Sequence, residues 1–284
     1  MTTLEQWRSA GDTRFTWRGH SVFTRVDGAG EPLLVLHGFP TASWDFAAIW
    51  PALVARFRVL ALDMIGFGFS AKPTTFEYSI GAQTDLIEAL VAHAGITRFR
   101  VLAHDIGLTV LQELLARHAN IASACLLNGG LFPETHHALP MQKLLASPLG
   151  PVVARLSSYR TFAAQMRRIW GATPPRDDEL RAMWELVSRD RGAVVMPKIL
   201  GYIAERRAQR SRWVGALVHA AVPIRLIDGL ADPISGAHMV ARYRELVPNA
   251  DVIALDGVGH YPHVEAPQRV VESLLAHADA HAFG

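Results

Sequence analysis

The chain has 284 residues, of which 50% are hydrophobic and 19% charged, and 28 Lys and Arg against 26 Asp and Glu give a formal net charge of +2. This length is near the upper limit for one hydrophobic core, and the composition excludes a disordered protein. The near-neutral charge indicates no nucleic-acid or membrane surface, and no apolar run is long enough to span a bilayer. A single cysteine, Cys125, and a polar N-terminus without a signal segment favour a soluble, cytoplasmic protein.

Short apolar stretches alternate with longer amphipathic ones along most of the chain. The stretches that predict strands are Ser21–Val26, Leu33–Leu36, Val59–Ala61, Arg100–Ala103, Ser123–Leu127, Ile224–Ile227 and Val252–Leu255. The stretches that predict helices are Ile80–Ala94, Leu108–His118, Met239–Leu246 and Gln268–His281. This alternation predicts an α/β fold with a mostly parallel central sheet that helices cover on both faces.

The alternation stops between residues 129 and 215, where the chain is helical and interrupted by prolines. Residues 130–215 contain 14 Lys and Arg against 7 Asp and Glu, a balance of +7, whereas the rest of the chain has a balance of −5. We therefore expect residues 1–128 and 216–284 to form one α/β core and residues 129–215 to form a basic helical cap over its ligand-binding edge. The alternative is a helical decoration at the periphery.

The strongest local motif is Val101–Val110, which has the pattern of a strand, a tight turn between small residues and a helix. A turn of this kind, the nucleophile elbow, presents its middle side chain above the sheet. That side chain is usually a serine, and here it is Asp105. Taken alone, Asp105 fits the N-cap of the following helix equally well.

A second turn, His37–Pro40, follows the predicted strand Leu33–Leu36. A glycine-containing turn at this place leaves a backbone N–H free at the carboxyl edge of the sheet. The N–H groups of Phe39 and Ile106 are therefore predicted to form an oxyanion hole. The alternative is an ordinary strand–helix turn.

Two further polar residues follow predicted strands. Asp232 comes after Ile224–Ile227, and His260 comes 28 residues later, after Val252–Leu255. The order nucleophile, acid, histidine is that of the α/β-hydrolase architecture. Asp232 is expected to orient His260, which would take a proton from water. His104, beside the nucleophile, is expected to face elsewhere.

An aspartate nucleophile suits displacement at a saturated carbon, because the resulting ester is then hydrolysed by water. The leaving group would be an epoxide oxygen or a halide. A halide requires side-chain N–H donors, and the side chains of Phe39 and Ile106 have none. An epoxide oxygen requires a proton, for which Tyr202 and Tyr159 in the predicted cap are candidates.

These motifs resemble those of the epoxide hydrolases of the α/β-hydrolase superfamily, to which haloalkane and fluoroacetate dehalogenases are related. The resembling residues are Ala103–Gly107, His37–Pro40, Asp232 and His260. Four longer strings, at residues 37–41, 66–70, 128–136 and 212–217, are similar to a hydrolase of this superfamily along nearly the whole chain. The resemblance implies an α/β-hydrolase fold with a cap and assigns Tyr202 to a proton donor of the cap. Ile106 departs from the tryptophan that epoxide hydrolases commonly have after the nucleophile.

The sequence therefore predicts an epoxide hydrolase that forms vicinal diols through an ester on Asp105. The expected substrate is a small hydrophobic epoxide, with water as the second reactant and no cofactor, metal or nucleic acid. The expected substrate-binding residues are His37, Pro40, Leu131, Phe132 and Trp170. Two alternatives are a haloalkane dehalogenase with the same Asp–His–Asp triad and a non-catalytic binding protein of this fold. We expect a monomer or a homodimer.

Overall fold

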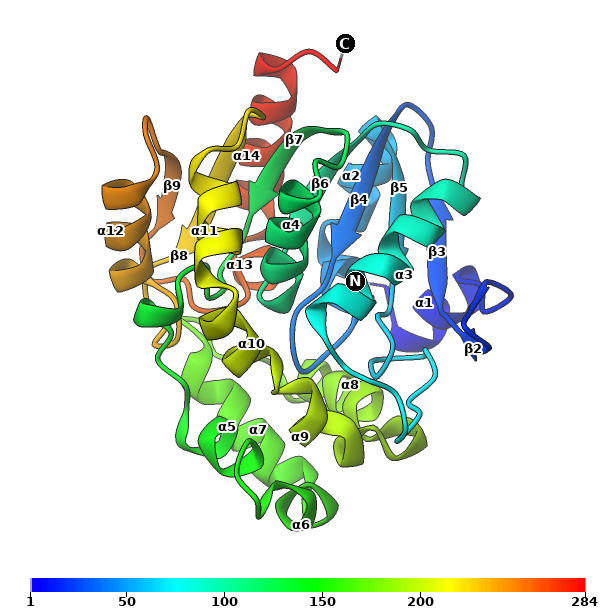
Figure 1. Ribbon diagram of the computed structural model, residues 1–284. Coiled ribbons are helices and arrows are strands. Elements are labelled where there is room, and N and C mark those ends of the chain that lie inside the picture. The colour runs from blue at the N-terminus through cyan, green and yellow to red at the C-terminus, as the bar shows by residue number, and fades with distance from the viewer. Residues whose placement is uncertain (1, 284) are drawn as a thin grey trace.

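Within residues 2–283, which the structure describes, the computed structural model has a seven-stranded central sheet (Figure 1). In spatial order the strands are β3 (Thr24–Asp27), β5 (Phe57–Leu62), β4 (Glu31–Leu36), β6 (Phe99–Ala103), β7 (Ile121–Leu126), β8 (Ile224–Gly229) and β9 (Asp251–Leu255). The edge strand β3 pairs antiparallel with β5, and every other neighbouring pair is parallel. The predicted fold class, a mostly parallel sheet, is confirmed.

Helices cover both faces of this sheet, as Figure 1 shows. One face carries α3 (Ile80–His93), α4 (Ile106–Ala116), α11 (Arg210–Val218) and α12 (Ala237–Leu246), and the other carries α2 (Trp50–Arg56) and α14 (Pro267–Ala280). Every residue of β6 and β7 is buried, because strands between two helical layers have no face toward water. The largely apolar composition of these strands, with Arg100 and Ser123 as exceptions, has this physical cause.

Several short helices and strands were not predicted from the sequence. These are α1 (Leu4–Ala10), the 3₁₀ helix η1 (Ser43–Ala48), α13 (Pro262–Glu265) and a small hairpin of β1 (Thr16–Trp17) and β2 (His20–Ser21). Helix α2 is also missed. Each is too short to show a clear hydrophobic period, so tertiary packing decides its structure.

The region between β7 and β8 forms a helical layer beside the carboxyl ends of the strands (Figure 1). Its elements are η2 (Pro133–Thr135), α5 (Pro140–Leu145), α6 (Gly150–Arg155), α7 (Tyr159–Ile169), α8 (Asp177–Ser188), η3 (Arg189–Val195), α9 (Met196–Ile199) and α10 (Tyr202–Ala208). The predicted boundary at residue 215 falls inside α11, which packs against α4 of the core.

No helix within residues 2–283 has the length and apolar character needed to cross a bilayer.

Candidate active site

Asp105 lies at a strained turn between β6 and α4. Its backbone has φ 46° and ψ −109°, and its N–H donates to the carbonyl oxygen of Asn128 over 2.9 Å. Two glycines make room for this turn. A Cβ on Gly107 would lie 2.6 Å from the carbonyl oxygen of Leu36, and one on Gly129 would lie 2.7 Å from the Cα of Asp105. The Asp105 side chain makes no capping hydrogen bond to α4, so its position at the N-cap does not explain it.

The turn after β4 brings a backbone donor to this carboxylate. The N–H of Phe39 donates to Oδ2 of Asp105 over 3.0 Å. Ile106 is the first residue of α4, and the first N–H groups of a helix have no partner within the helix. The structure thus shows the Phe39 N–H bound to the Asp105 carboxylate, and Ile106 follows Asp105 at the start of α4.

His37 has a structural place in the same turn rather than a place at the cavity. Its Nε2 accepts from the N–H of Met64 over 3.0 Å, and its Nδ1 lies 2.8 Å from the carbonyl oxygen of Gly38. These bonds tie the loop after β4 to the loop after β5. The predicted substrate contact of His37 is therefore corrected, whereas Pro40, three residues on, does line the cavity.

His260 and Asp232 form a buried pair. The Nδ1 of His260 lies 2.7 Å from Oδ2 of Asp232. Ser235 donates to the same oxygen from its hydroxyl over 2.7 Å, and the N–H of Ile234 donates to Oδ1 over 2.8 Å. Asp232 is thus held by several donors besides His260. Burial acts to raise the pKa of Asp232, but the charge and hydrogen bond of His260 together with these donors lower it to about 2.

The same surroundings act on His260 in the opposite direction. Burial acts to lower the pKa of His260, but the charge of Asp232, its hydrogen bond and the charge of Asp105 raise it to about 9. The imidazole is therefore protonated at neutral pH. Removal of the charge on Asp105 removes one of the causes of this raised pKa.

Asn128 supports the acid from the end of β7, a role that the sequence did not reveal. Its Nδ2 donates to Oδ2 of Asp232 over 3.2 Å and to the carbonyl oxygen of Gly229 over 2.9 Å, and its Oδ1 accepts from the N–H of Gly229 over 2.7 Å. The available signal was its place directly after a buried strand, at the edge where the other site residues lie.

A cavity of roughly 300 Å³ lies between the core and the cap. The core contributes Asp105, His260, Phe39, Pro40 and Ile234 to its lining. The cap contributes mostly apolar side chains: Leu139, Met141, Leu145, Val153, Leu156, Phe162, Met166, Ile169, Trp184, Val187 and Met196, with Gln142, Ser157, Thr161 and Gln165 as polar members. A carboxylate and an imidazole thus meet at one end of a largely apolar cavity.

Three predicted substrate contacts lie elsewhere. Leu131, Phe132 and Trp170 are buried but do not line this cavity. Phe132 packs toward Tyr243, and Trp170 stacks on Tyr261 with ring centroids 4.9 Å apart. Trp170 follows directly after Ile169, which does face the cavity, and consecutive residues at a helix end point in different directions.

The two predicted proton donors differ in position. Tyr159 lies near the surface of the cap, where its hydroxyl donates to the carboxylate of Asp177, so the structure does not bring it to the site. Tyr202, at the start of α10, is fully buried, and its hydroxyl has no hydrogen-bond partner among the described residues. Burial and the charge of Asp105 raise the pKa of Tyr202, although its side chain is not part of the cavity lining.

Arg206 is a buried cation beside Tyr202 that the sequence also did not reveal. Its guanidinium carbon lies 4.8 Å from the centre of the ring of Tyr202, the residue one helical turn earlier in α10. Its Nε and Nη2 donate to the hydroxyl oxygen of Thr109 over 3.1 and 2.6 Å. Its Nη1 has no hydrogen-bond partner within residues 2–283. Burial lowers the pKa of Arg206, and the charges of Tyr202 and Asp105 act to raise it, so this guanidinium can stabilise nearby negative charge.

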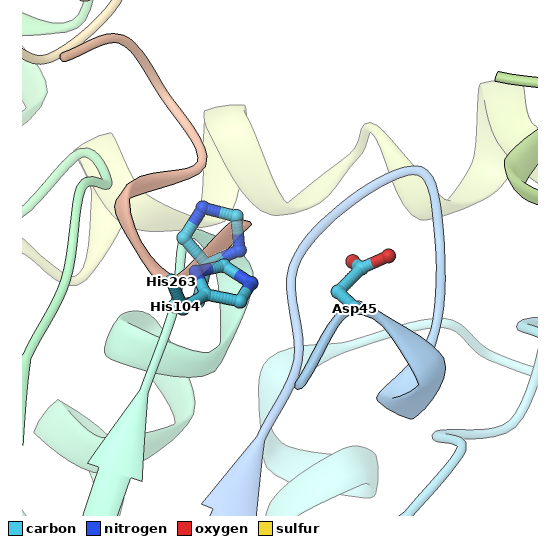
Figure 2. Close-up of side chains that lie close together, drawn as sticks. All are labelled: Asp45, His104 and His263. Atoms are coloured by element: carbon cyan, nitrogen blue, oxygen red, sulfur yellow. The ribbon is translucent and has the colours of Figure 1, made fainter. Parts of the chain in front are cut away.

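Side chains from three separate segments of the chain lie close together in Figure 2. His104, His263 and Asp45 are buried, and their potential ligand atoms lie within 4.8 Å of one another. Two imidazoles and a carboxyl group are side chains that bind transition metals. Burial lowers the pKa of His104 and of His263 and raises that of Asp45. None of the three lines the cavity, but the Nε2 of His104 lies 2.8 Å from the carbonyl oxygen of His260.

The end of α7 is hydrogen-bonded to the loop that carries His260. The N–H of His260 donates to the carbonyl oxygen of Ile169 over 2.8 Å, and the N–H of Ala172 donates to that of Gly257 over 2.7 Å. Glu265 accepts from the N–H of Gly171 over 2.7 Å. The cap and the histidine loop are therefore joined by backbone bonds at this point.

The fold and this arrangement define a class of protein. The family model for the alpha/beta hydrolase fold matches residues 31–267, and the chain belongs to this family. It is 40% identical to the mesoderm-specific transcript protein of Mus musculus over 96% of this chain and 87% of that protein. It is 38% identical to LipZ of Mycobacterium tuberculosis, which is named as a hydrolase, over 96% of this chain and 97% of that one.

Proteins with named substrates share the fold at lower identity. Haloalkane dehalogenase 2 of Mycobacterium tuberculosis is 26% identical over 88% of each chain. The solved structure of epoxide hydrolase CorEH superimposes with a TM-score of 0.76 at 18% identity, over 95% of this chain and 98% of that one. This structural likeness shows the fold alone. The protein is therefore a hydrolase-family member whose substrate the comparisons do not assign.

Proposed function

We propose that this protein is an epoxide hydrolase that opens an epoxide to a vicinal diol through an ester on Asp105. One observation carries the proposal. The nucleophile elbow presents a carboxylate rather than a hydroxyl, and that carboxylate shares an apolar cavity with His260. A carboxylate forms a productive ester by displacement at a saturated carbon, which is the chemistry of epoxide opening.

The first step makes the ester. An oxygen of Asp105 attacks an epoxide carbon, the bond between this carbon and the ring oxygen breaks, and the ring oxygen takes a proton. We assign this proton to the Tyr202 hydroxyl, which is buried, unpartnered among the described residues and subject to the charge of Asp105. The guanidinium of Arg206 then stabilises the phenolate that remains.

The second step hydrolyses the ester. Esterification removes the negative charge of Asp105, which is one cause of the raised pKa of His260. The imidazole then loses its proton more readily, and this proton returns through solvent to the Tyr202 phenolate. The neutral imidazole accepts a proton from the water molecule that attacks the carboxyl carbon of Asp105. The N–H groups of Phe39 and Ile106 stabilise the oxyanion. The ester bond breaks, and the departing diol oxygen takes the proton of the hydroxyl group that water has added. The diol is released, and the Asp105 carboxylate and the His260 imidazolium are restored.

The route is tested by a single turnover of styrene oxide in ¹⁸O-water. Because water attacks the carboxyl carbon of Asp105, the first diol should contain no solvent oxygen, and the label should appear in the peptide that contains Asp105. A first diol that carries ¹⁸O would rule out the ester. Asp105→Asn serves as the control and should give neither diol nor label.

Dehalogenation is the second candidate, since the same carboxylate displaces halide. The observation in its favour is that Trp184, whose indole N–H is a suitable donor, lines the cavity. Against it, the residues that would hold the halide beside the nucleophile, Phe39 and Ile106, have no side-chain donor. Halide release from 1-bromobutane without diol formation from styrene oxide would favour this candidate. Turnover of neither compound would favour a non-catalytic binding protein.

A further inference from the structure

Four large apolar side chains are exposed together at the far end of the cap. They are Leu144 (39% exposed), Leu149 (61%), Val152 (54%) and Leu156 (76%), and we call them the apolar tip. They belong to α5, α6 and the residues that flank α6, and α6 is the helix most distant from the sheet in Figure 1. Within the described residues, one other large hydrophobic side chain is comparably exposed, Val26 on the edge strand β3.

The segment of the cap that carries the apolar tip has charged residues of one sign. Residues 135–176 contain no Asp or Glu. The same segment contains six basic residues: Lys143, Arg155, Arg160, Arg167, Arg168 and Arg176. Lys143 and Arg155 adjoin the tip in sequence, are exposed and form no ion pair with any residue in the range 2–283. Exposed apolar side chains beside unpaired cations are the pattern of a surface that enters the interface of an anionic bilayer.

We propose that the apolar tip docks on an anionic lipid surface. The geometry favours a lipid surface over a second copy of this chain, because a symmetric contact through the tip would place Lys143 and Arg155 against their own equivalents. The tip also lies at an end of the molecule, where two short helices carry it, so its side chains can enter a bilayer without displacement of the core. The overall charge of +2 conceals this local cationic surface.

The apolar tip is continuous with the lining of the cavity. Leu156 belongs to the apolar tip and also lines the cavity, as do its neighbour Val153 and the buried Leu145. An apolar molecule that leaves the bilayer at the tip therefore reaches the cavity without crossing water. In combination with the proposed function, on which this step rests, the substrate is a long-chain epoxide dissolved in the membrane.

Co-sedimentation of the full chain with vesicles tests the docking independently of catalysis. We expect the wild-type chain to bind vesicles of phosphatidylcholine with phosphatidylserine and to bind phosphatidylcholine alone at least about tenfold more weakly, because each basic residue near an anionic surface contributes severalfold. High salt should weaken the binding. Failure to bind the anionic vesicles would overturn the proposal and assign the tip to a protein partner.

Two variants show whether the tip itself is the docking surface. Leu149→Ser/Val152→Ser changes two tip residues that do not line the cavity, and we expect it to lower vesicle binding about tenfold or more. Val26→Ser, which alters the exposed hydrophobic residue outside the cap, should bind as the wild type does. Equal binding of wild type and double variant would overturn the proposal.

The same variants distinguish a failure of docking from a failure of the proposed function. With Leu149→Ser/Val152→Ser, diol formation from water-soluble styrene oxide should stay unchanged, whereas turnover of a long-chain epoxide in anionic vesicles should fall about tenfold with the loss of binding. Vesicle binding without diol formation from either substrate would refute the proposed function and leave the docking intact.

Discussion

The sheet core and the cap contribute to the same cavity by different physical means. In the core, the backbone of the sheet positions Asp105, Asp232 and His260. Parallel strands end at the same edge, and each of these residues lies in the turn or loop after a strand. The cap supplies the cavity with side chains from helix faces, and small rotations of those helices decide which residues line it. The chemistry is thus set by strand order, and the choice of substrate is set by helix packing.

The strongest test of the core is loss of the nucleophile. Asp105→Asn keeps the shape of the side chain but removes the anion, so we expect diol formation to fall by about a thousandfold or more. Initial rates with styrene oxide measure this change, and thermal unfolding checks that the fold is retained. Substantial residual turnover would mean that water opens the epoxide directly. It would contradict the conclusion that the core supplies the reacting groups while the cap supplies the substrate-binding side chains.

The base affects a later step than the nucleophile. His260→Gln should slow ester hydrolysis by about a thousandfold and leave ester formation possible, because Tyr202 and Asp105 remain. Mass spectrometry after exposure to styrene oxide should then show the peptide of Asp105 enlarged by one substrate molecule. An unmodified peptide would place His260 in the first step as a proton donor.

A smaller effect is expected in the cap, where two tyrosines form a matched pair. Tyr202→Phe should slow ester formation by about a hundredfold, since it removes the proposed proton donor. Tyr159→Phe should leave the rate unchanged, because the hydroxyl of Tyr159 is bound to Asp177 away from the cavity. Rapid-quench measurement of ester formation compares them. Equal rates for both variants would transfer the proton donation to the imidazolium of His260.

The smallest expected effect concerns stability and pH. Because folding raises the pKa of His260 from its ordinary 6.5 to about 9, its protonation stabilises the fold fully below pH 6.5, and this contribution is lost as the pH rises through 9. Urea unfolding of the wild type at pH 6.5 and 9 should show this loss. His260→Gln should show a smaller decrease, whereas the exposed His219→Gln should behave as the wild type.

The sheet core could be predicted from the sequence, because a buried parallel strand is rich in apolar residues. A polar residue directly after such a strand therefore stands out as a candidate site residue. The side chains with which the cap lines the cavity were harder to predict from the sequence. Trp170 and Phe132 are apolar residues of the predicted region, but only the packed helices show that Ile169 and Phe162 face the cavity instead. Periodicity identifies the buried side of a helix and does not say whether that side meets the core or a cavity.

Polar residues outside the motifs were equally hidden. Within residues 2–283 Arg206 forms no ion pair, and in the sequence it is one of many arginines of a basic segment. Its significance depends on burial beside Tyr202, which the sequence pattern does not encode. Asn128 becomes informative only when β7 and β8 are adjacent and its amide reaches Asp232.

The backbone bonds between the end of α7 and the histidine loop have a consequence for motion. Because the carbonyl oxygen of Ile169 accepts a hydrogen bond from the N–H of His260, the cap cannot move away from the core at that end without displacing His260. Opening would instead be a pivot about this joint, with α5 and α6 travelling furthest. The site would then exchange its contents at the end remote from the histidine, and the catalytic groups would keep their positions while the entrance moves.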